Sequence, residues 1–302
     1  MKLLRFEFVC EMFILQWLTS SSTKRDLTHS PVVVGSLVIV VEDGSTLAAY
    51  STESGNLIWK TPVLETVETS TDPIRSIAFN SQYLYVARYT WNLMAHDLKT
   101  GKIIWEYDLP GRSTSYVVTN ERYVFFAAGD TVSILDANTG LDVWTYDESG
   151  YFGPILLSGN TLYITDERHA ALISLDIDSH QIHWIRDLPI STYEFSCMLE
   201  VGDNLLIAAQ KLVMVSKQDG SILWATDNLG YLECPVLLKN EIYIRNNQTD
   251  LYLFDKESGH EKGELQVRTN TVMKQDFFRG PIIANGLLVV PFGDNRLFVY
   301  QP

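Results

Sequence analysis

The sequence is poor in cysteine and lacks long apolar runs. Its 302 residues include three cysteines, Cys10, Cys197 and Cys234, which share no close spacing. This excludes the paired-cysteine patterns of zinc sites, and an odd number of cysteines without such a pattern indicates reduced thiols in a reducing compartment. No run of about 18 apolar residues is present, which excludes a transmembrane helix. We therefore predict a chain that binds no metal and does not insert into a membrane.

Basic residues are also scarce. The chain has 23 Lys and Arg against 37 Asp and Glu, a formal net charge of −14. Such an excess of acid repels phosphate groups and disfavours nucleic acid or an anionic membrane surface as the partner.

Catalytic signatures are missing as well. The sequence contains no Gly-x-Ser-x-Gly, P-loop, dinucleotide-binding or His-Glu-x-x-His motif, and its six histidines are scattered. The acidic pairs Asp147–Glu148 and Asp166–Glu167 fall in predicted connecting loops, where we expect solvated side chains. We therefore predict no catalytic residue and no cofactor.

The first residues have some features of an export signal and lack others. Met1–Arg5 is basic and Met12–Leu18 is largely apolar, but Glu7 and Glu11 interrupt the apolar region and no Ala-x-Ala-like cleavage site follows. Together with the expected reduced thiols, this predicts a cytoplasmic protein. A periplasmic or exported protein is the alternative.

What the sequence does contain is a repeat of about 40 residues. Five tryptophans, each preceded by a turn, are spaced 46, 39, 40 and 40 residues apart: Trp59, Trp105, Trp144, Trp184 and Trp224. A glycine stands four residues before most of them or continues the register: Gly55, Gly101, Gly140, Gly220 and Gly259. His180 takes the glycine position in the fourth copy. A fixed period of this length indicates one supersecondary unit copied along an array.

Each copy contains four short runs rich in Val, Ile, Leu and Tyr, bounded by Gly, Asn and Asp, which predict strands. No stretch of ten residues has a helical period. The Asp-x-x-Thr/Ser-Gly element between the third and fourth runs predicts a turn in which the aspartate accepts backbone N–H groups and the glycine adopts positive φ. Four antiparallel strands repeated at this period form one propeller blade.

We predict an all-β fold, a seven-bladed β-propeller of four-stranded antiparallel blades that fills residues 1–302 as a single domain. The last blade combines residues 281–302 with a strand at about residues 8–19, because Trp17 precedes Trp59 by one period. Closure by the N-terminal strand would remove an exposed sheet edge. The six in-register tryptophans, Trp17 included, are expected to fill the wedges between blades.

The motif Ala-x-Asp-x-x-Thr-Gly-x-x-x-Trp, complete from Ala95 to Trp105, resembles the PQQ-like β-propeller repeat of quinoprotein dehydrogenases and BamB-type outer-membrane assembly lipoproteins. The resemblance extends from about Phe13 to Gln301. It implies the fold and says little about chemistry. Both groups usually have eight blades and an export signal. The dehydrogenases hold their quinone with a tryptophan floor, a vicinal disulfide and calcium, and this chain has no adjacent cysteine pair.

The candidate site is a rim of aromatic and basic residues just before the first strand of each blade, where the loops gather at one mouth of the channel. Its members are Arg112, Tyr151, Phe152, Tyr193, Phe195, Tyr231, Phe277, Phe278 and Arg279, with Trp91 as a separate anchor on the opposite face. One interpretation is that these rings pack loops against the blades; the other is a binding rim, because this composition is enriched at protein-binding hot spots. We predict a non-enzymatic scaffold that binds a protein or peptide. The alternatives are an exported BamB-like assembly factor and a quinone- or sugar-binding enzyme.

Overall fold

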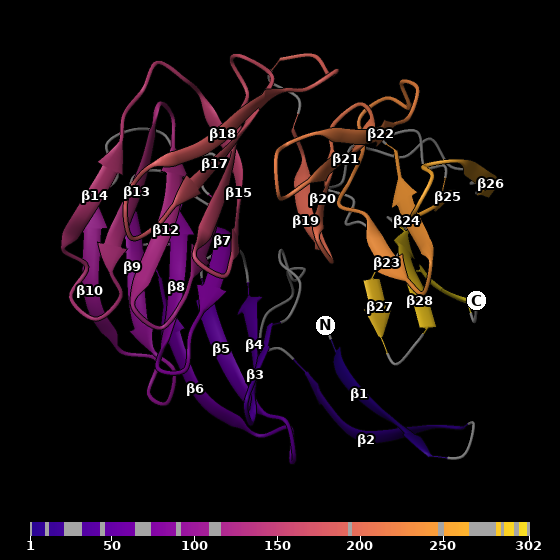
Figure 1. Ribbon diagram of the computed structural model, residues 1–302. Coiled ribbons are helices and arrows are strands. Elements are labelled where there is room, and N and C mark those ends of the chain that lie inside the picture. Colours follow the sequence, from indigo (N-terminus) through magenta and orange to yellow (C-terminus); the bar gives the residue numbers. More distant parts are fainter. Residues whose placement is uncertain are drawn as a thin grey trace. The chain divides into compact units, whose positions relative to one another are not determined.

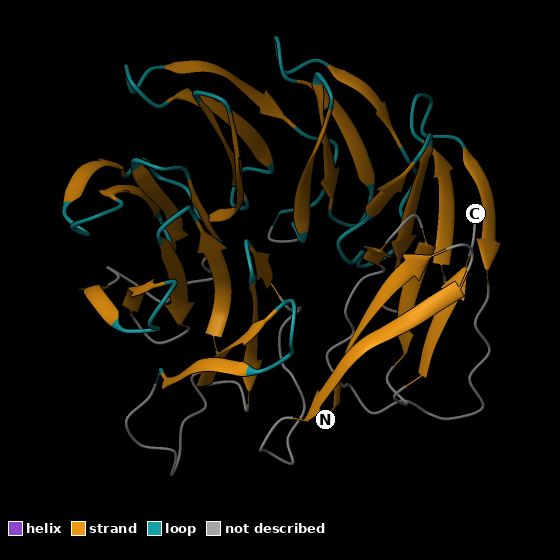
Figure 2. Ribbon diagram, turned by 90° about the horizontal axis from the view of Figure 1, so that it is seen from below, coloured by secondary structure: helices purple, strands orange, loops and turns teal. Residues whose placement is uncertain are grey.

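The computed structural model describes residues 2–9, 12–20, 32–42, 46–63, 74–88, 92–108, 116–192, 195–246, 251–265, 282–284, 287–292 and 296–300. The chain divides into two compact units, Met1–Glu148 (unit 1) and Ser149–Pro302 (unit 2), and each is described by itself. The described residues form strands joined by short loops, and no helix occurs among them (Figure 2).

Among its described residues, unit 1 contains one hairpin and three antiparallel sheets of four strands (Figure 1). The hairpin is β1 (Lys2–Val9) and β2 (Met12–Ser20). The sheets are β3 (Val32–Val34), β4 (Leu37–Glu42), β5 (Thr46–Ser51), β6 (Leu57–Pro62); β7 (Ile74–Phe79), β8 (Tyr83–Arg88), β9 (Asn92–Asp97), β10 (Ile103–Asp108); and β11 (Val117–Thr119), β12 (Tyr123–Ala128), β13 (Thr131–Asp136), β14 (Asp142–Tyr146).

Unit 2 contains three more four-stranded sheets and one of three strands among its described residues. They are β15 (Phe152–Ser158), β16 (Thr161–Asp166), β17 (Ala171–Asp176), β18 (Ile182–Asp187); β19 (Cys197–Val201), β20 (Asn204–Ala208), β21 (Leu212–Ser216), β22 (Ile222–Ala225); β23 (Val236–Leu238), β24 (Glu241–Arg245), β25 (Leu251–Asp255), β26 (Glu261–Leu265); and β27 (Ile282–Ala284), β28 (Leu287–Phe292), β29 (Arg296–Tyr300). In every sheet the strands follow chain order. The prediction of four-stranded antiparallel repeats is confirmed for six sheets.

The N-terminal segment differs from the single strand predicted at about residues 8–19. Residues 8 and 9 end β1, and β2 begins at Met12 and pairs with β1, with Phe13 opposite Phe8 and Trp17 opposite Arg5. The charged start of the chain, compared above with an export signal, is therefore part of a hairpin. The sequence predicted that the N-terminal strand, here β2, completes the last blade beside β29. These two strands belong to different units, so their pairing stays a prediction.

The middle strands of each sheet carry the core. In β4, β8 and β12 the four central residues are all buried, and the same holds in β5, β9 and β13. A strand that is covered on both faces has apolar residues at nearly every position. This explains why the second and third runs of each repeat do not alternate between apolar and polar residues. The fourth strands are largely exposed and bury mainly their tryptophan.

Four of the tryptophans, Trp59, Trp105, Trp184 and Trp224, pack against the glycine turn of the next sheet. The Trp105 indole donates from Nε1 to the carbonyl of Ala137 at 3.1 Å, and Trp59 does the same to Leu98 at 2.8 Å. A Cβ placed on Gly140 would lie 2.6 Å from Trp105 Cδ2. The glycine therefore has a second role that the sequence reasoning missed, because its missing side chain makes room for the indole of the neighbouring sheet. Trp184 and Trp224 repeat the arrangement in unit 2.

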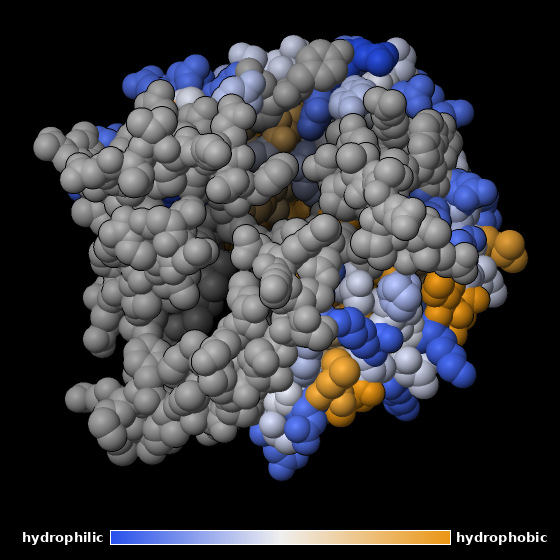
Figure 3. All heavy atoms as spheres, turned by 180° about the vertical axis from the view of Figure 1, so that it is seen from behind, coloured by the Kyte–Doolittle hydropathy of each residue, from blue (hydrophilic) through white to orange (hydrophobic). Residues whose placement is uncertain are grey.

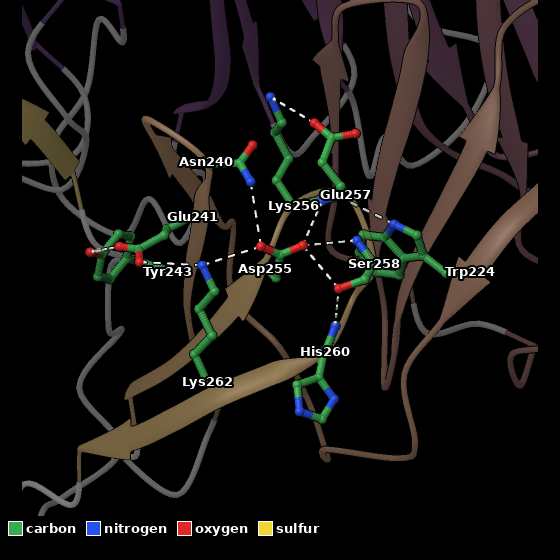
Figure 4. A network of polar contacts seen from close by, with 10 residues as sticks. All are labelled: Trp224, Asn240, Glu241, Tyr243, Asp255, Lys256, Glu257, Ser258, His260 and Lys262. Atoms are coloured by element: carbon green, nitrogen blue, oxygen red, sulfur yellow. Dashed lines mark hydrogen bonds and ion pairs between the residues drawn. The ribbon is translucent and has the colours of Figure 1, made fainter.

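The aspartate turn is seen most completely at Asp255 (Figure 4). Asp255 Oδ1 accepts the N–H of Ser258 at 3.0 Å and its hydroxyl at 2.9 Å, and Lys262 Nζ lies 3.2 Å from Oδ2. The hydrogen bonds from Ser258, followed by Lys262, lower the pKa of Asp255 to about 2. Gly259 closes the turn with φ +67°. His180 has φ +58° in the same turn, a left-handed conformation that is strained for a residue with a side chain.

Candidate functional site

Unit 2 brings the ends of three sheets together where their first strands begin. Strand β15 lies beside β19. The loop after β20 accepts backbone hydrogen bonds from the segment before β23, Leu229 N–H to Gln210 O at 2.8 Å and Leu232 N–H to Ala209 O at 3.1 Å. These hydrogen bonds join the segment that carries Tyr231, a residue of the predicted rim, to the neighbouring sheet. Tyr151, another rim residue, stands directly before β15 and accepts the N–H of Glu167 at 2.7 Å.

The predicted rim divides into buried, exposed and undescribed residues. Phe152 is 1% exposed and Phe195 is 7% exposed, so these two rings belong to the core and do not face a partner. Tyr151 is half-buried and Tyr231 is 57% exposed. The remaining members lie outside the described residues: Trp91, Arg112, Tyr193, Phe277, Phe278 and Arg279. The ring of Tyr231 is therefore the described member most open to a partner.

The prediction of reduced thiols is wrong for two of the three cysteines, because Cys197 and Cys234 form a disulfide with their Cα atoms 5.2 Å apart. Cys197 is the first residue of β19, and Cys234 lies two residues before β23. The bond therefore links neighbouring sheets at the same end as Tyr231. Sequence reasoning missed the bond because it looked for closely spaced cysteines, and these two are 37 positions apart. That separation is close to one repeat. Because equivalent positions of consecutive repeats meet in space, the repeat length was the signal that could have paired them.

A buried arginine and a half-buried glutamate of opposite charge stand next to the disulfide. Arg245 ends β24 and is 1% exposed, and its carbonyl accepts the N–H of Glu233 at 2.9 Å. Burial raises the pKa of Glu233 and lowers that of Arg245, while the attraction between their charges opposes both shifts. The pair thus favours one geometry of the segment that carries Cys234 and Tyr231.

The acidic pair Asp166–Glu167 is buried, which corrects the prediction of solvated loop side chains. Asp166 is 6% exposed, and its Oδ1 accepts the N–H groups of Arg168 and His169 at 3.0 and 3.2 Å. Its Oδ2 lies 2.6 Å from His169 Nδ1, and the His169 side chain is 54% exposed. The aspartate therefore organises the turn between β16 and β17.

Glu167 is the first residue of this turn and is 9% exposed. Its N–H donates to Tyr151 O at 2.7 Å, and a Cβ on Gly153 would overlap its carboxyl group. Burial, with a smaller contribution from the charge of Asp166, raises the pKa of Glu167 to about 7. This carboxyl group therefore exchanges a proton near neutral pH. The nearby glycines Gly150 and Gly153 were the sequence signal that something packs closely here.

The described residues provide no metal centre or membrane span. Within the described ranges, no group of three or more His, Cys, Asp and Glu side chains is arranged to hold a metal ion. None of their elements is a helix with the length and apolar character needed to cross a membrane.

Comparison with known proteins agrees with the repeat. The family model described as outer membrane protein assembly factor BamB matches residues 16–186, more than half of the chain. Among curated proteins, BamB of Yersinia pestis is 21% identical over 235 residues (75% of this chain, 49% of that protein), and BamB of Escherichia coli is 22% identical over 205 residues (64% and 48%). The chain spans about half the length of these curated relatives.

Solved structures give the fold independently. The crystal structure of BamB from Moraxella catarrhalis matches with a TM-score of 0.72 at 17% identity, covering 93% of this chain and 84% of that one. Sqt1 of Saccharomyces cerevisiae matches with a TM-score of 0.75 at 8% identity, covering 100% and 90%. The fold is an all-β propeller of four-stranded antiparallel sheets. The chain belongs to the PQQ-like β-propeller repeat family, whose matching model is that of the outer membrane protein assembly factor BamB.

Proposed function

We propose that this chain is a protein-binding β-propeller scaffold that acts outside the cytoplasm in the assembly of outer membrane proteins. The proposal adopts the exported, BamB-like alternative in place of the cytoplasmic scaffold predicted from the sequence. Two observations support it: the family match, and the relatives that carry the name of outer membrane protein assembly factor.

The observation that carries the location is the disulfide between Cys197 and Cys234. Disulfides form and persist in oxidising compartments such as the bacterial periplasm, whereas the cytosol keeps thiols reduced. A bond that links two neighbouring sheets also contributes to the stability of the fold, so the protein benefits from reaching such a compartment. The cytoplasmic prediction rested on the opposite assumption about the same residues.

A scaffold without enzymatic activity is supported by how the tryptophans are used. Trp59, Trp105, Trp184 and Trp224 each donate a hydrogen bond to the next sheet and cover its glycine turn. Their indole rings are occupied by packing between sheets, so these four do not offer a floor for a quinone.

The complete propeller has seven blades in this proposal, with β27, β28 and β29 completed by β2. The period from Trp17 to Trp59 supports it. Deleting residues 1–20 should then lower the thermal midpoint sharply. A truncated protein that melts at the wild-type temperature would refute the closure.

The partner-binding surface includes the rim at the first-strand ends, represented by Tyr231 and Tyr151 and extended by the undescribed Tyr193, Phe277, Phe278, Arg279 and Arg112. Trp91 remains the proposed anchor of the opposite face. Tyr231→Ala should weaken partner binding while leaving the melting temperature unchanged, because its ring is largely exposed.

The deciding experiment is maleimide labelling of the full chain in fractionated cells of its native host. We expect the protein in the envelope fraction, with two additional labels per chain appearing only after reduction, from Cys197 and Cys234. A cytosolic protein whose thiols all react without reduction would refute the location. Co-purification of wild-type protein from gently solubilised membranes should then recover the outer membrane assembly machinery.

A further inference from the structure

The outermost strands of unit 1 expose apolar side chains at one corner. On β10, Ile103 is 42% exposed and Ile104 is 47% exposed. On β14 and just before it, Val143 is 44% exposed and Leu141 is 69% exposed. The two strands are joined where Trp105, next to Ile104, covers Gly140, next to Leu141, and where the Tyr107 hydroxyl donates to Asp142 Oδ1 at 2.8 Å. Among the described residues visible in Figure 3, apolar residues gather in separate patches between hydrophilic ones.

Acidic side chains border these apolar residues. Glu106 and Asp108 of β10 are exposed, as is Asp142 of β14, and the exposed basic residues of the turn before β10 are Lys99 and Lys102. We call this surface the acidic–apolar corner, made up of Ile103, Ile104, Glu106, Asp108, Leu141, Asp142 and Val143. An apolar centre with a charged border is the anatomy of a protein interface.

Other fourth strands share the apolar residues but have different charges. Strand β6 places Lys60 and Pro62 where β10 has Glu106 and Asp108. Strand β18 places Arg186 where β10 has Tyr107, and the Arg186 Nε donates to Gly220 O at 2.7 Å. In β22, Ile222 is 39% exposed and Leu223 is 51% exposed, with Asp227 following the strand. The corner in unit 1 thus combines apolar exposure with a local excess of acid.

We propose that the acidic–apolar corner docks a segment of a partner protein that carries lysine or arginine beside apolar side chains. Complementary charge increases the rate and selectivity of such an encounter, while burial of the isoleucines and leucine provides affinity. A second copy of this chain would bring acid against acid, and phosphate-rich partners are repelled in the same way. The inference rests on the proposed function as a protein-binding scaffold and adds the surface and the chemistry of the partner.

The test uses a fluorescent peptide of about eight residues, the length of one strand, in which leucine and lysine alternate. A second peptide carries glutamate in place of lysine. Anisotropy titrations with the full-length protein should show binding of the lysine peptide alone, weakening as salt rises from about 0.05 M to about 0.5 M. Equal binding of both peptides, or no binding of either, would overturn the proposal.

Matched variants locate the site. Glu106→Gln with Asp108→Asn should weaken lysine-peptide binding about fivefold or more, whereas Asp178→Asn with Asp187→Asn removes the same charge from exposed positions of unit 2 and should change it less than about twofold. Ile103→Ser with Ile104→Ser should also weaken binding about fivefold, and Ile222→Ser with Leu223→Ser should leave it unchanged. If a variant at the corner and its control in unit 2 weaken binding equally, the peptide is attracted to the acidic protein in general. The proposal that the corner is the docking site is then refuted. Wild-type urea midpoints in all four variants establish that each is folded.

Co-purification separates this inference from the proposed function. If wild-type protein recovers the assembly machinery and the Ile103→Ser, Ile104→Ser variant recovers as much, the scaffold function stands and the corner is not its docking surface. If wild-type protein recovers none of that machinery, the proposed function fails, while the peptide titrations still decide whether the corner binds basic apolar segments.

Discussion

Replacing Trp105 with alanine should lower the free energy of unfolding by about 4 kcal/mol. The side chain is 9% exposed, covers Gly140 of the next sheet and lies 5.8 Å, centroid to centroid, from the ring of Tyr85. Burying roughly 200 Å² of indole at about 25 cal/mol per Å² gives about 5 kcal/mol, an upper value because the unfolded chain already buries part of this surface. Emptying a large aromatic site in a core typically costs about 3–5 kcal/mol.

The lost hydrogen bond adds little to this figure. The Ala137 carbonyl that accepts Trp105 Nε1 also accepts the Tyr85 hydroxyl at 3.1 Å, so it keeps a partner in the variant. With an unfolding entropy of about 2.1 cal/mol/K per residue over 302 residues, a loss of about 4 kcal/mol lowers the melting temperature by about 6 °C.

Urea unfolding followed by far-ultraviolet circular dichroism measures this change without relying on tryptophan emission. Trp105→Phe keeps a ring in the wedge and should cost about 1–2 kcal/mol. Ile104→Ala changes the adjacent, largely exposed side chain and should cost no more than about 0.5 kcal/mol. A loss below about 1 kcal/mol for Trp105→Ala would show that the indole does not hold the two sheets together.

Three further changes test other parts of the fold. Converting both Cys197 and Cys234 to serine should lower stability by about 4 kcal/mol, since their separation of 37 residues closes a loop of that size, and a reducing agent should then have no further effect on the urea midpoint. Folded Glu167 keeps its proton up to a pKa of about 7, whereas unfolded glutamate releases it near 4.5, so wild-type stability should fall by about 3 kcal/mol between these pH values. Glu167→Gln should remove that decline in urea titrations across the range, and an unchanged slope would contradict the buried position of the carboxyl. His180→Gly should raise the melting temperature by relieving about 1 kcal/mol of backbone strain at φ +58°, and a lower midpoint would mean that contacts of the imidazole outweigh the strain.

The fold could be predicted largely from the spacing of Trp59, Trp105 and the later tryptophans. Residues that recur once per repeat report local structure, because the same turn and the same wedge are needed in every copy. The exception was the beginning of the chain. There, Lys2–Val9 forms a strand paired with Met12–Ser20, and Lys2–Val9 carries none of the turn and tryptophan residues that give the other strands their register.

Side-chain burial at the ends of the sheets was harder to predict. Phe152 and Phe195 stand where loops meet first strands, and their apolar rings turn into the core. The sequence predicted that Asp166 and Glu167 are solvated. In the structure, Gly153 of β15 leaves room for the Glu167 carboxyl group. Whether a loop side chain is buried depends on how much space the side chains of the facing strand leave. That strand lies elsewhere in the sequence, so the residues next to the loop do not reveal it.

The repeats also show where this fold tolerates change. Two residues after the wedge tryptophan stand Thr61, Tyr107 and Arg186, and each hydrogen bonds to the turn or strand of the next sheet. Thr61 donates to the Gly101 carbonyl, Tyr107 to the Asp142 carboxylate and Arg186 to the Gly220 carbonyl. A hydroxyl, a phenol and a guanidinium therefore make the equivalent contact in three different sheets. Because packing there requires only that some donor reach the next sheet, the charge of the outer corner is free to differ between blades. A propeller can therefore keep its wedges constant while each corner presents a different chemistry, and the acid beside Ile103 and Ile104 is the kind of difference that would select one partner over another.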